Sequence, residues 1–534
     1  MPKEVKELSS NYPKPPHIAV VAAIIEEATR LMAIHFALSR TQVTHELRKM
    51  DMEDTIASQI CPTFLMPVRC EISKYRTLSG MCNNLIHPSW ASARSAMVRY
   101  VPPAYPDGIS QPRTLSINGN RLPNPRLLST VINDGENKRD SSITVMIATW
   151  GQVIVHDINF GSPTLDERGN PVHCCAKNKE EAHPACMPYE IPDGDYFYKY
   201  YNRSCLNFVR LTPSLRPGCP LGPREPMNLV SGFLDASIIY GSTSDTANHL
   251  RERKNGRLKS SKPYHELGLK DLLPPQTNKP DFLCQRHNRP TDLFCFEGGD
   301  LRSNQQLPLT LMHTILMREH NRISDYLAFL VPGLDDNTIF EETRRIVIAQ
   351  LQIITYREFL PIVVGEPLIE KYGLQLKDVG YYKGYDPKVN AESRVAFQAA
   401  AFRFGHSLVP DVIKRFNKNH EEVSSLRLSH VLRQPFELYK PAIIDSFLLG
   451  LVNQLASRMD PTLTTELLNH LFERPGAQFG GDLAAANIQR GRDVGLPGYI
   501  EYREYCGLGR AEKFSDLVGF MSNKTIHKLA SVYE

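Results

Sequence analysis

The sequence lacks the features that would place this protein in a membrane or on nucleic acid. No uninterrupted apolar run is long enough to span a bilayer, and the best one, Ile18 to Ile25, is far too short. Lys and Arg exceed Asp and Glu by only 62 − 58 = 4 charges, too few to indicate nucleic acid or an anionic membrane surface as a partner. Internal repeats, low-complexity tracts and an Arg-Gly-Asp tripeptide are also absent. The sequence therefore predicts no transmembrane segment and no nucleic-acid partner.

The chain has the composition and periodicity of a folded, mainly α protein. Its 534 residues are 42% hydrophobic, which is typical of a globular protein and not of a disordered one. Residues 61–534 are expected to form a single large helical domain with long disulfide-braced loops, and residues 1–60 a pro-segment or gene-model extension. In that extension, Ile18 to Leu47 is expected to form an amphipathic helix with little to pack on. Ser142 is expected to cap a helix that runs to about Asp157. Further helices are expected over residues 309–330, 340–364, 392–406 and 443–459.

Eleven cysteines indicate disulfides and an oxidising compartment. They cluster at short range as Cys70 with Cys82, Cys284 with Cys295, and a group of five comprising Cys174, Cys175, Cys186, Cys205 and Cys219. The sequons at Asn202 and Asn523 would carry glycans only in a secreted protein. Because Met1 to Ser10 is charged and has no apolar core, we expect a secreted protein whose leader is missing from this chain.

One face of the helix expected to end near Asp157 carries two residues that could activate a peroxide. Gln152 and His156 lie one turn apart and share a face. An uncharged imidazole can take a proton from bound peroxide and return it to the leaving oxygen, while the glutamine positions the peroxide. Taken alone, the pair fits a buried structural histidine better than a catalytic one.

Asp157 points about 100° away from His156 round the helix and needs its own partner. The segment Ser231 to Ser237 offers oxygens at every second residue, namely Ser231, the Phe233 carbonyl, Asp235 and Ser237. With Asp157 they form an all-oxygen set that suits Ca²⁺. The plainer interpretation is a turn with capping serines.

Two further segments complete a candidate haem pocket. A Gly-rich loop delivers Arg302, whose guanidinium would stabilise negative charge as the O–O bond breaks. Arg403 and His406 are three residues apart, so that His406 can be an axial iron ligand while Arg403 pairs with a propionate. Asn487 would accept the other N–H of His406, and Arg490 would reach the second propionate. Each residue alone is open to a structural interpretation.

Taken together, these segments resemble the animal haem peroxidases of the peroxidase–cyclooxygenase superfamily, in particular the peroxinectin and chorion-peroxidase type. The matching segments run in order from about Cys61 to Leu517 and include residues 75–84, 150–157, 233–241, 312–322, 353–357, 402–406 and 487–493. The resemblance implies haem b and Ca²⁺ as cofactors, His156, Gln152 and Arg302 as the groups that activate H2O2, and His406 with Asn487 on the iron.

The chain departs from the family pattern in two places. Many members tie the haem to the protein by esters from two acidic residues, and those positions are Val155 and Gln305 here. We therefore predict non-covalent haem. Family members also continue well past the segment ending at Leu508, so we expect a C-terminally incomplete domain with Cys506 unpaired.

The leading hypothesis is a secreted haem peroxidase that uses H2O2 to oxidise a phenol, a tyrosine or a halide, with extracellular-matrix or cell-surface association possible. The alternative is an adhesion or interaction module that keeps the fold without efficient turnover. A third hypothesis, a zinc site at His173, Cys174, Cys175, His183 and Cys186, fits no familiar zinc spacing, and disulfides explain the cysteines better.

Overall fold

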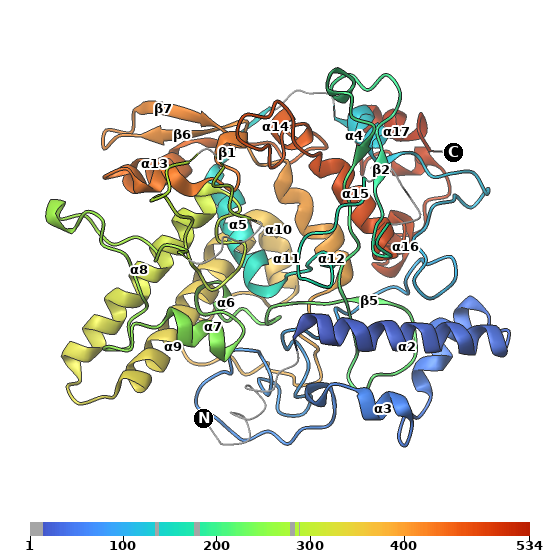
Figure 1. The fold of residues 1–534 in the computed structure, drawn as a ribbon, viewed down its shortest axis with the longest axis horizontal. Helices are drawn as coiled ribbons and strands as arrows, with labels where there is room; N and C mark the ends of the chain where they lie inside the picture. The colour runs from blue at the N-terminus through green and yellow to red at the C-terminus, as the bar shows by residue number, and fades with distance from the viewer. Residues whose placement is uncertain (1–13, 134–137, 176–181, 278–282, 288, 534) are drawn as a thin grey trace.

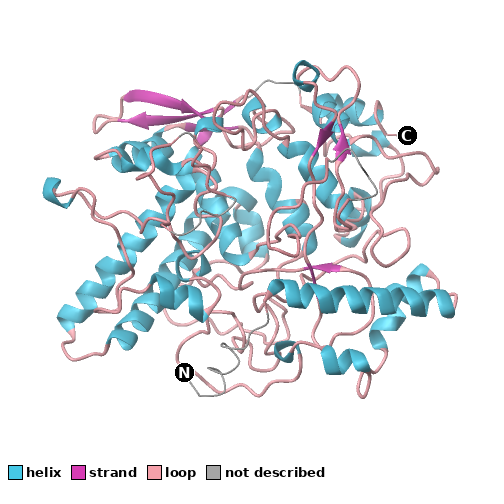
Figure 2. Cartoon of the chain, in the orientation of Figure 1, coloured by secondary structure: helices cyan, strands magenta, loops and turns pink. Residues whose placement is uncertain are grey.

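The computed structural model describes residues 14–133, 138–175, 182–277, 283–287 and 289–533. Within these residues the regular structure is mostly helical and the strands are short (Figure 2). The prediction of a mainly α protein with long ordered loops is confirmed.

The elements carry the labels of Figure 1. The α-helices are α2 (Pro15–His35), α3 (Ile56–Ile60), α4 (Pro125–Ile132), α5 (Val145–Ile158), α6 (Ser237–Tyr240), α7 (Ser244–Leu250), α8 (Leu307–Leu330), α9 (Asp336–Ile354), α10 (Leu360–Val364), α11 (Glu366–Lys371), α12 (Val395–Ala399), α13 (Ile443–Asn453), α14 (Thr465–Leu468), α15 (Leu483–Asp493), α16 (Tyr499–Tyr505) and α17 (Asn523–Ala530). Two shorter helices matter below, the π-helix η6 (Thr355–Phe359) and the 3-10 helix η7 (Ala401–His406). The strands are β1 (Arg139–Thr144), β2 (Tyr189–Glu190), β3 (Cys205–Leu206), β4 (Pro213–Ser214), β5 (Glu225–Pro226), β6 (Val412–Phe416), β7 (Glu422–Arg427) and β8 (Leu455–Ser457). They form antiparallel pairs, β1 with β8, β2 with β3, β4 with β5 and β6 with β7.

The main hydrophobic core surrounds α5, which runs through the middle of the molecule between α8 and α15 (Figure 1). α8 begins at Leu307 and carries Pro308 in its first turn, where a proline has no N–H to leave unpaired. Its buried Leu309, Met312 and Leu316 recur at helical spacing and face this core. α5 contacts α8, α13 and α6, and this packing fixes the position of its residues.

The helix predictions hold where apolar periodicity is long. α8 confirms the helix predicted over 309–330, and α9, η6 and α10 continue one another across 340–364. The segment 392–406 is helical only in part, because the backbone breaks at Ala400 between α12 and η7. The segment 443–459 stops being helical at Asn453, because Leu455–Ser457 pairs with β1.

The predicted cap at Ser142 is wrong. Ser142 lies within β1, and both its backbone N–H and its hydroxyl donate to Asp140. The helix begins at Val145 instead, with Thr144 at its N-cap position. Pairing with β8, far along the chain, overrides the local capping signal.

The expectation that Ile18 to Leu47 has little to pack on is also wrong. α2 ends at His35, and its Ile18, Val21 and Ile25 are buried in a second core cluster. Glu26 pairs with Arg224 at 3.0 Å, and the Thr29 hydroxyl accepts from the Gly222 N–H. The N-terminal segment therefore packs on the body of the protein.

Five disulfides brace the loops. The predicted pairs Cys70–Cys82 and Cys284–Cys295 are confirmed. Within the group of five cysteines, Cys174 pairs with Cys186 and Cys175 with Cys205. Cys219 leaves that group and pairs with Cys61, 158 residues away. Cys506 is free and exposed, as predicted.

One helical stretch among the described residues, Asp336–Val364, is long and apolar enough by length and composition to cross a membrane. The sequence expectation considered only uninterrupted apolar runs and overlooked it. Core helices of soluble proteins and signal sequences meet the same criteria. Only 28% of the apolar window is buried, and α9 packs against α8.

Candidate functional site

α5 carries the predicted distal residues on one face. His156 is 5% exposed, and its Nδ1 is buried without a hydrogen-bond partner among the described residues. Burial, reinforced by the charge of Arg302, holds the pKa of His156 well below its usual range. Gln152, one turn earlier, accepts from the Gln306 side chain, which precedes α8. The imidazole is therefore neutral, as a base that receives a proton must be.

Arg302 lies next to this face and is firmly held. Its Nε and Nη2 donate to the two oxygens of Asp300 at 2.8 and 2.7 Å. Nη2 also donates to the His156 carbonyl at 2.9 Å and Nη1 to the Asn159 carbonyl at 2.8 Å. The guanidinium stacks 4.0 Å from the centre of the Phe160 ring. A guanidinium has five N–H donors, and among the described residues one N–H on Nη1 has no partner, so that it could meet a ligand.

Asp300 orients Arg302 and is itself ionised. It is 3% exposed, and although burial opposes ionisation, Arg302 lowers the pKa of Asp300 to about 2. The sequence analysis missed Asp300, Asn159 and Phe160. An acidic residue two positions before the arginine in the Gly-rich loop was the available signal for Asp300. The backbone carbonyl of Asn159 leaves no signature in sequence.

The structure brings together four of the five predicted calcium ligands, Asp157, Ser231, Asp235 and Ser237. Asp157 is fully buried and accepts from the backbone N–H groups of Ala236 and Ile238 at 3.1 and 3.2 Å. The Ser231 hydroxyl donates to Asp235 at 2.7 Å, and the Ser237 hydroxyl donates to the Asp157 carbonyl at 2.7 Å.

The surroundings of this loop disfavour the negative charges of its two carboxyls. Burial raises the pKa of both carboxyls, and the charge of Asp235 raises that of Asp157 further. Asp235 Oδ1 is buried without a hydrogen-bond partner among the described residues. No group of three or more His, Cys, Asp or Glu side chains in the described chain can hold a metal ion, so any cation here would rely on hydroxyl and carbonyl oxygens beside two carboxylates.

The proximal residues meet on η7 and α15. In a 3-10 helix, residues three apart eclipse one another, so Arg403 and His406 project the same way. Asn487 Nδ2 lies 2.9 Å from His406 Nδ1, and Arg403 Nη1 donates to Asn487 Oδ1 at 3.1 Å. η7 also contacts α5, so the elements of the two predicted faces are neighbours.

The two predicted propionate partners differ in their surroundings. Arg490 donates to Asp493 at 2.7 Å and to the Val209 carbonyl at 2.9 Å, so a carboxylate already neutralises it. Arg403 has no carboxylate partner within the described ranges, and its Nε is buried and unpaired. Burial, with a smaller effect of Arg490, lowers the pKa of Arg403 to about 9. Arg403 is the guanidinium that most needs an anion.

These residues fit a haem. Burial lowers the pKa of His406 to about 3, so its imidazole is neutral and able to ligate iron. His406 and Arg403 nevertheless keep part of their surface accessible. A side chain that lies deep in the protein can still have accessible surface if it faces an internal space, and this would explain both properties of His406 and Arg403. The unpaired Arg403 Nε and the buried, unpaired Gln305 Oε1 also match a polar group that the protein alone does not supply.

The positions that would form haem esters hold no carboxyl. Val155 is buried on α5 next to His156, and Gln305 lies just before α8.

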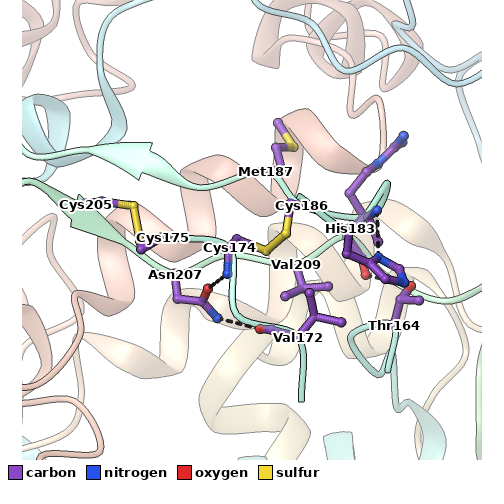
Figure 3. The surroundings of a disulfide bond; sticks show 12 residues. Thr164, Val172, Cys174, Cys175, His183, Cys186, Met187, Cys205, Asn207 and Val209 are labelled. Carbon is purple, nitrogen blue, oxygen red and sulfur yellow. Dashed lines mark hydrogen bonds between the residues drawn. A yellow bond between two sulfur atoms is a disulfide. The ribbon is translucent and has the colours of Figure 1, made fainter. Parts of the chain in front are cut away.

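The zinc hypothesis is wrong. Figure 3 shows Cys174 bonded to Cys186 and Cys175 bonded to Cys205, so these sulfurs are not thiolates. The backbone N–H of Cys174 donates to Asn207, and His183 Nδ1 accepts from the Ala185 N–H. The cluster stabilises the loop around β2 and β3.

Comparisons with known proteins agree with this geometry. The model of the family described as animal haem peroxidase matches residues 75–534. A chorion peroxidase from Aedes aegypti is 37% identical over 505 residues, covering 92% of this chain, and a human peroxidasin homolog is 37% identical over 482 residues, covering 87%. Among solved structures, peroxidase A from Dictyostelium discoideum superposes with a TM-score of 0.69 at 26% identity, covering 86% of this chain and 84% of its own. A fatty acid alpha-dioxygenase from Arabidopsis thaliana, at 18% identity and a TM-score of 0.66, shares the fold. This chain spans 62% of the chorion peroxidase and 32% of the peroxidasin homolog.

Proposed function

Because the chain belongs to the animal haem peroxidase family, we propose that it is a haem-dependent peroxidase that uses H2O2 to oxidise a small reducing substrate. The observation that carries the proposal is the contact between η7, which bears His406, and α5, which bears Gln152 and His156. The catalytic domain would be residues 61–534.

Haem, when bound, supplies the two-electron redox chemistry that no side chain offers. His406 would hold its iron, and Arg403 and Arg490 would bind its propionates. To ligate through Nε2, His406 must donate from Nδ1, so Asn487 must present Oδ1 to it. That orientation takes Oδ1 away from Arg403 and frees the guanidinium for a propionate.

On the distal side, His156 would take a proton from H2O2 and return it to the departing oxygen. Gln152 would hold the peroxide beside it. Arg302, kept in place by Asp300, would direct its remaining N–H to the negative charge that develops during O–O cleavage.

The reducing substrate would be a phenol, including tyrosine side chains, or a halide. Guaiacol and bromide distinguish these classes when each is offered with H2O2 to the haem-loaded protein. Peroxide-dependent oxidation of either supports the proposal. Haem-loaded, folded protein that oxidises neither would instead support an interaction module with the peroxidase fold.

The haem is expected to be held without covalent bonds. Val155 and Gln305 offer no carboxyl for an ester, so acidified organic solvent should extract essentially all of the haem from the polypeptide. Gln305→Glu, which restores one carboxyl, should retain haem on the chain after H2O2 treatment. Haem that stays with the unmodified polypeptide would refute the prediction.

A Ca²⁺ ion is expected to bind Asp157, Ser231, the Phe233 carbonyl, Asp235 and Ser237. It would relieve the repulsion between two buried carboxylates and occupy the unpaired Asp235 Oδ1. At a Ca²⁺ concentration 100 times the Kd, binding would stabilise the fold by about 2.7 kcal/mol. Chelation should therefore lower the Tm, and Ca²⁺ but not Mg²⁺ should restore it.

Asp235→Asn should abolish this calcium response, whereas Asp516→Asn, at an exposed carboxylate, should keep it. An equal response in wild type and Asp235→Asn would exclude this loop as the site.

The five disulfides support a secreted, extracellular protein, since such bonds persist in oxidising compartments. Asn202 and Asn523 are exposed, so both sequons are accessible for glycosylation. Association with the extracellular matrix or a cell surface would suit that location.

A further inference from the structure

Glu392 is a buried carboxyl group that the mechanism above does not use. It precedes α12 and is 4% exposed. Its Oε1 accepts from the Asn228 side chain at 3.2 Å and from the Ser393 N–H at 2.9 Å, and its Oε2 lies 2.5 Å from the Ser95 hydroxyl. The charge that acts on it is that of Arg394, whose guanidinium bonds to the Glu392 and Asn390 carbonyls rather than to the carboxyl. Burial raises the pKa of Glu392 to about 7.

The Ser95 hydroxyl links this carboxyl to the Ser92 carbonyl. The Ser95 oxygen lies 2.6 Å from the Ser92 carbonyl as well as 2.5 Å from Glu392 Oε2. A hydroxyl has one hydrogen, and neither a carbonyl nor a carboxylate can donate. The Ser95 hydroxyl therefore either shares its hydrogen between the two acceptors, or donates to Ser92 while a protonated Glu392 donates to Ser95.

Two of the residues that hydrogen-bond to Glu392, Asn228 and Ser393, hold the segment that follows α5. Asn228 donates to the Ile158 carbonyl at 3.1 Å and accepts from the Phe160 N–H at 2.9 Å. Ser393 accepts from the Asn159 side chain at 2.6 Å. Residues 158–160 are thereby fixed at both backbone and side chain.

That segment in turn fixes Arg302. The Asn159 carbonyl accepts from Nη1 at 2.8 Å, and the Phe160 ring lies under the guanidinium. We propose that Glu392, as a buried acid, is a positioning residue that holds Arg302 in place through Asn228, Ser393 and residues 158–160. The effect on turnover rests on the proposed peroxidase function, whereas the effect on the segment does not.

Two substitutions of Glu392 distinguish the effect of its hydrogen bonds from the effect of its ionisation. Glu392→Gln keeps an acceptor for Asn228 and Ser393 and a donor for Ser95, but cannot ionise. Glu392→Ala removes all of them. Glu266→Gln, at an exposed position, is the matched control.

The first readout is amide hydrogen exchange in peptides that contain Phe160, which needs no peroxidase activity. Glu392→Ala should exchange at least tenfold faster than wild type there, while Glu392→Gln and the control match wild type at pH 6. Exchange in Glu392→Ala equal to wild type would overturn the proposal.

The second readout is the pH dependence of the reaction of the haem-loaded protein with H2O2 between pH 6 and 9. Above pH 7 the wild-type carboxyl ionises. The buried negative charge turns the Ser95 hydroxyl toward it and disturbs the hydrogen bonds that hold residues 158–160, so Arg302 loosens and the rate constant should fall severalfold. Glu392→Gln should lack this alkaline decline. The same decline in Glu392→Gln would overturn the proposal. If the wild-type protein never reacts with H2O2, only the proposed peroxidase function is contradicted. The hydrogen-exchange result would still decide the role of Glu392.

Discussion

A His406→Ala variant is expected to lose the Soret band that haem gives in the wild-type protein. Alanine has no ligand for iron, and Asn487 and Arg403 cannot replace the imidazole because they supply an amide and a cation. Changing residues that merely support a ligand costs about 10- to 100-fold in metal affinity, so losing the ligand itself should cost at least about 100-fold. The measurement is a titration of the purified protein with haem, followed at the Soret maximum.

His430 provides the control, because it is an exposed histidine on the short 3-10 helix after β7. His430→Ala should bind haem as wild type does. A full Soret band with wild-type affinity in His406→Ala would show that the iron ligand lies elsewhere.

The second large effect is expected from His156→Ala. The variant should still bind haem, since His406, Arg403 and Asn487 are unchanged, but it loses the neutral base beside the peroxide. General acid–base catalysis contributes about 100- to 10,000-fold, so the rate constant for reaction with H2O2 should fall within that range. Stopped-flow absorbance after mixing haem-loaded protein with H2O2 measures it directly.

Arg302 remains anchored to Asp300 in that variant, so the loss reports on proton transfer rather than on the guanidinium. His527→Ala, at an exposed position on α17, should react at the wild-type rate. A His156→Ala rate within a factor of three of wild type would remove His156 from the catalytic role.

Local patterns in the sequence predict the parts of this fold that depend on local packing. α8 follows its apolar periodicity over its whole length, and the pairing of Cys70 with Cys82 follows from their proximity. Contacts between distant segments are not encoded in this way. The local pattern predicts a cap at Ser142 because it contains no information about β8, which follows more than 300 residues later. In the same way, the partner of Cys219 lies 158 residues away.

The same distinction holds for the candidate site. Residue types and their order predict His156, Arg302, His406 and Asn487, and the structure places them on neighbouring elements. Their catalytic and ligand roles stay predictions. The groups that position them, such as Asp300, the Asn159 carbonyl and Glu392, act through backbone geometry and burial, which no single sequence displays.

The measurement that tests the central claim most directly is the optical spectrum of the haem-loaded wild-type protein before and after one equivalent of H2O2. A haem peroxidase with His406 as axial ligand predicts a Soret band that shifts on addition of peroxide and returns when a phenol is added. The proposed function would be contradicted if the well-folded protein takes up no haem, or if its Soret band does not change when H2O2 is added.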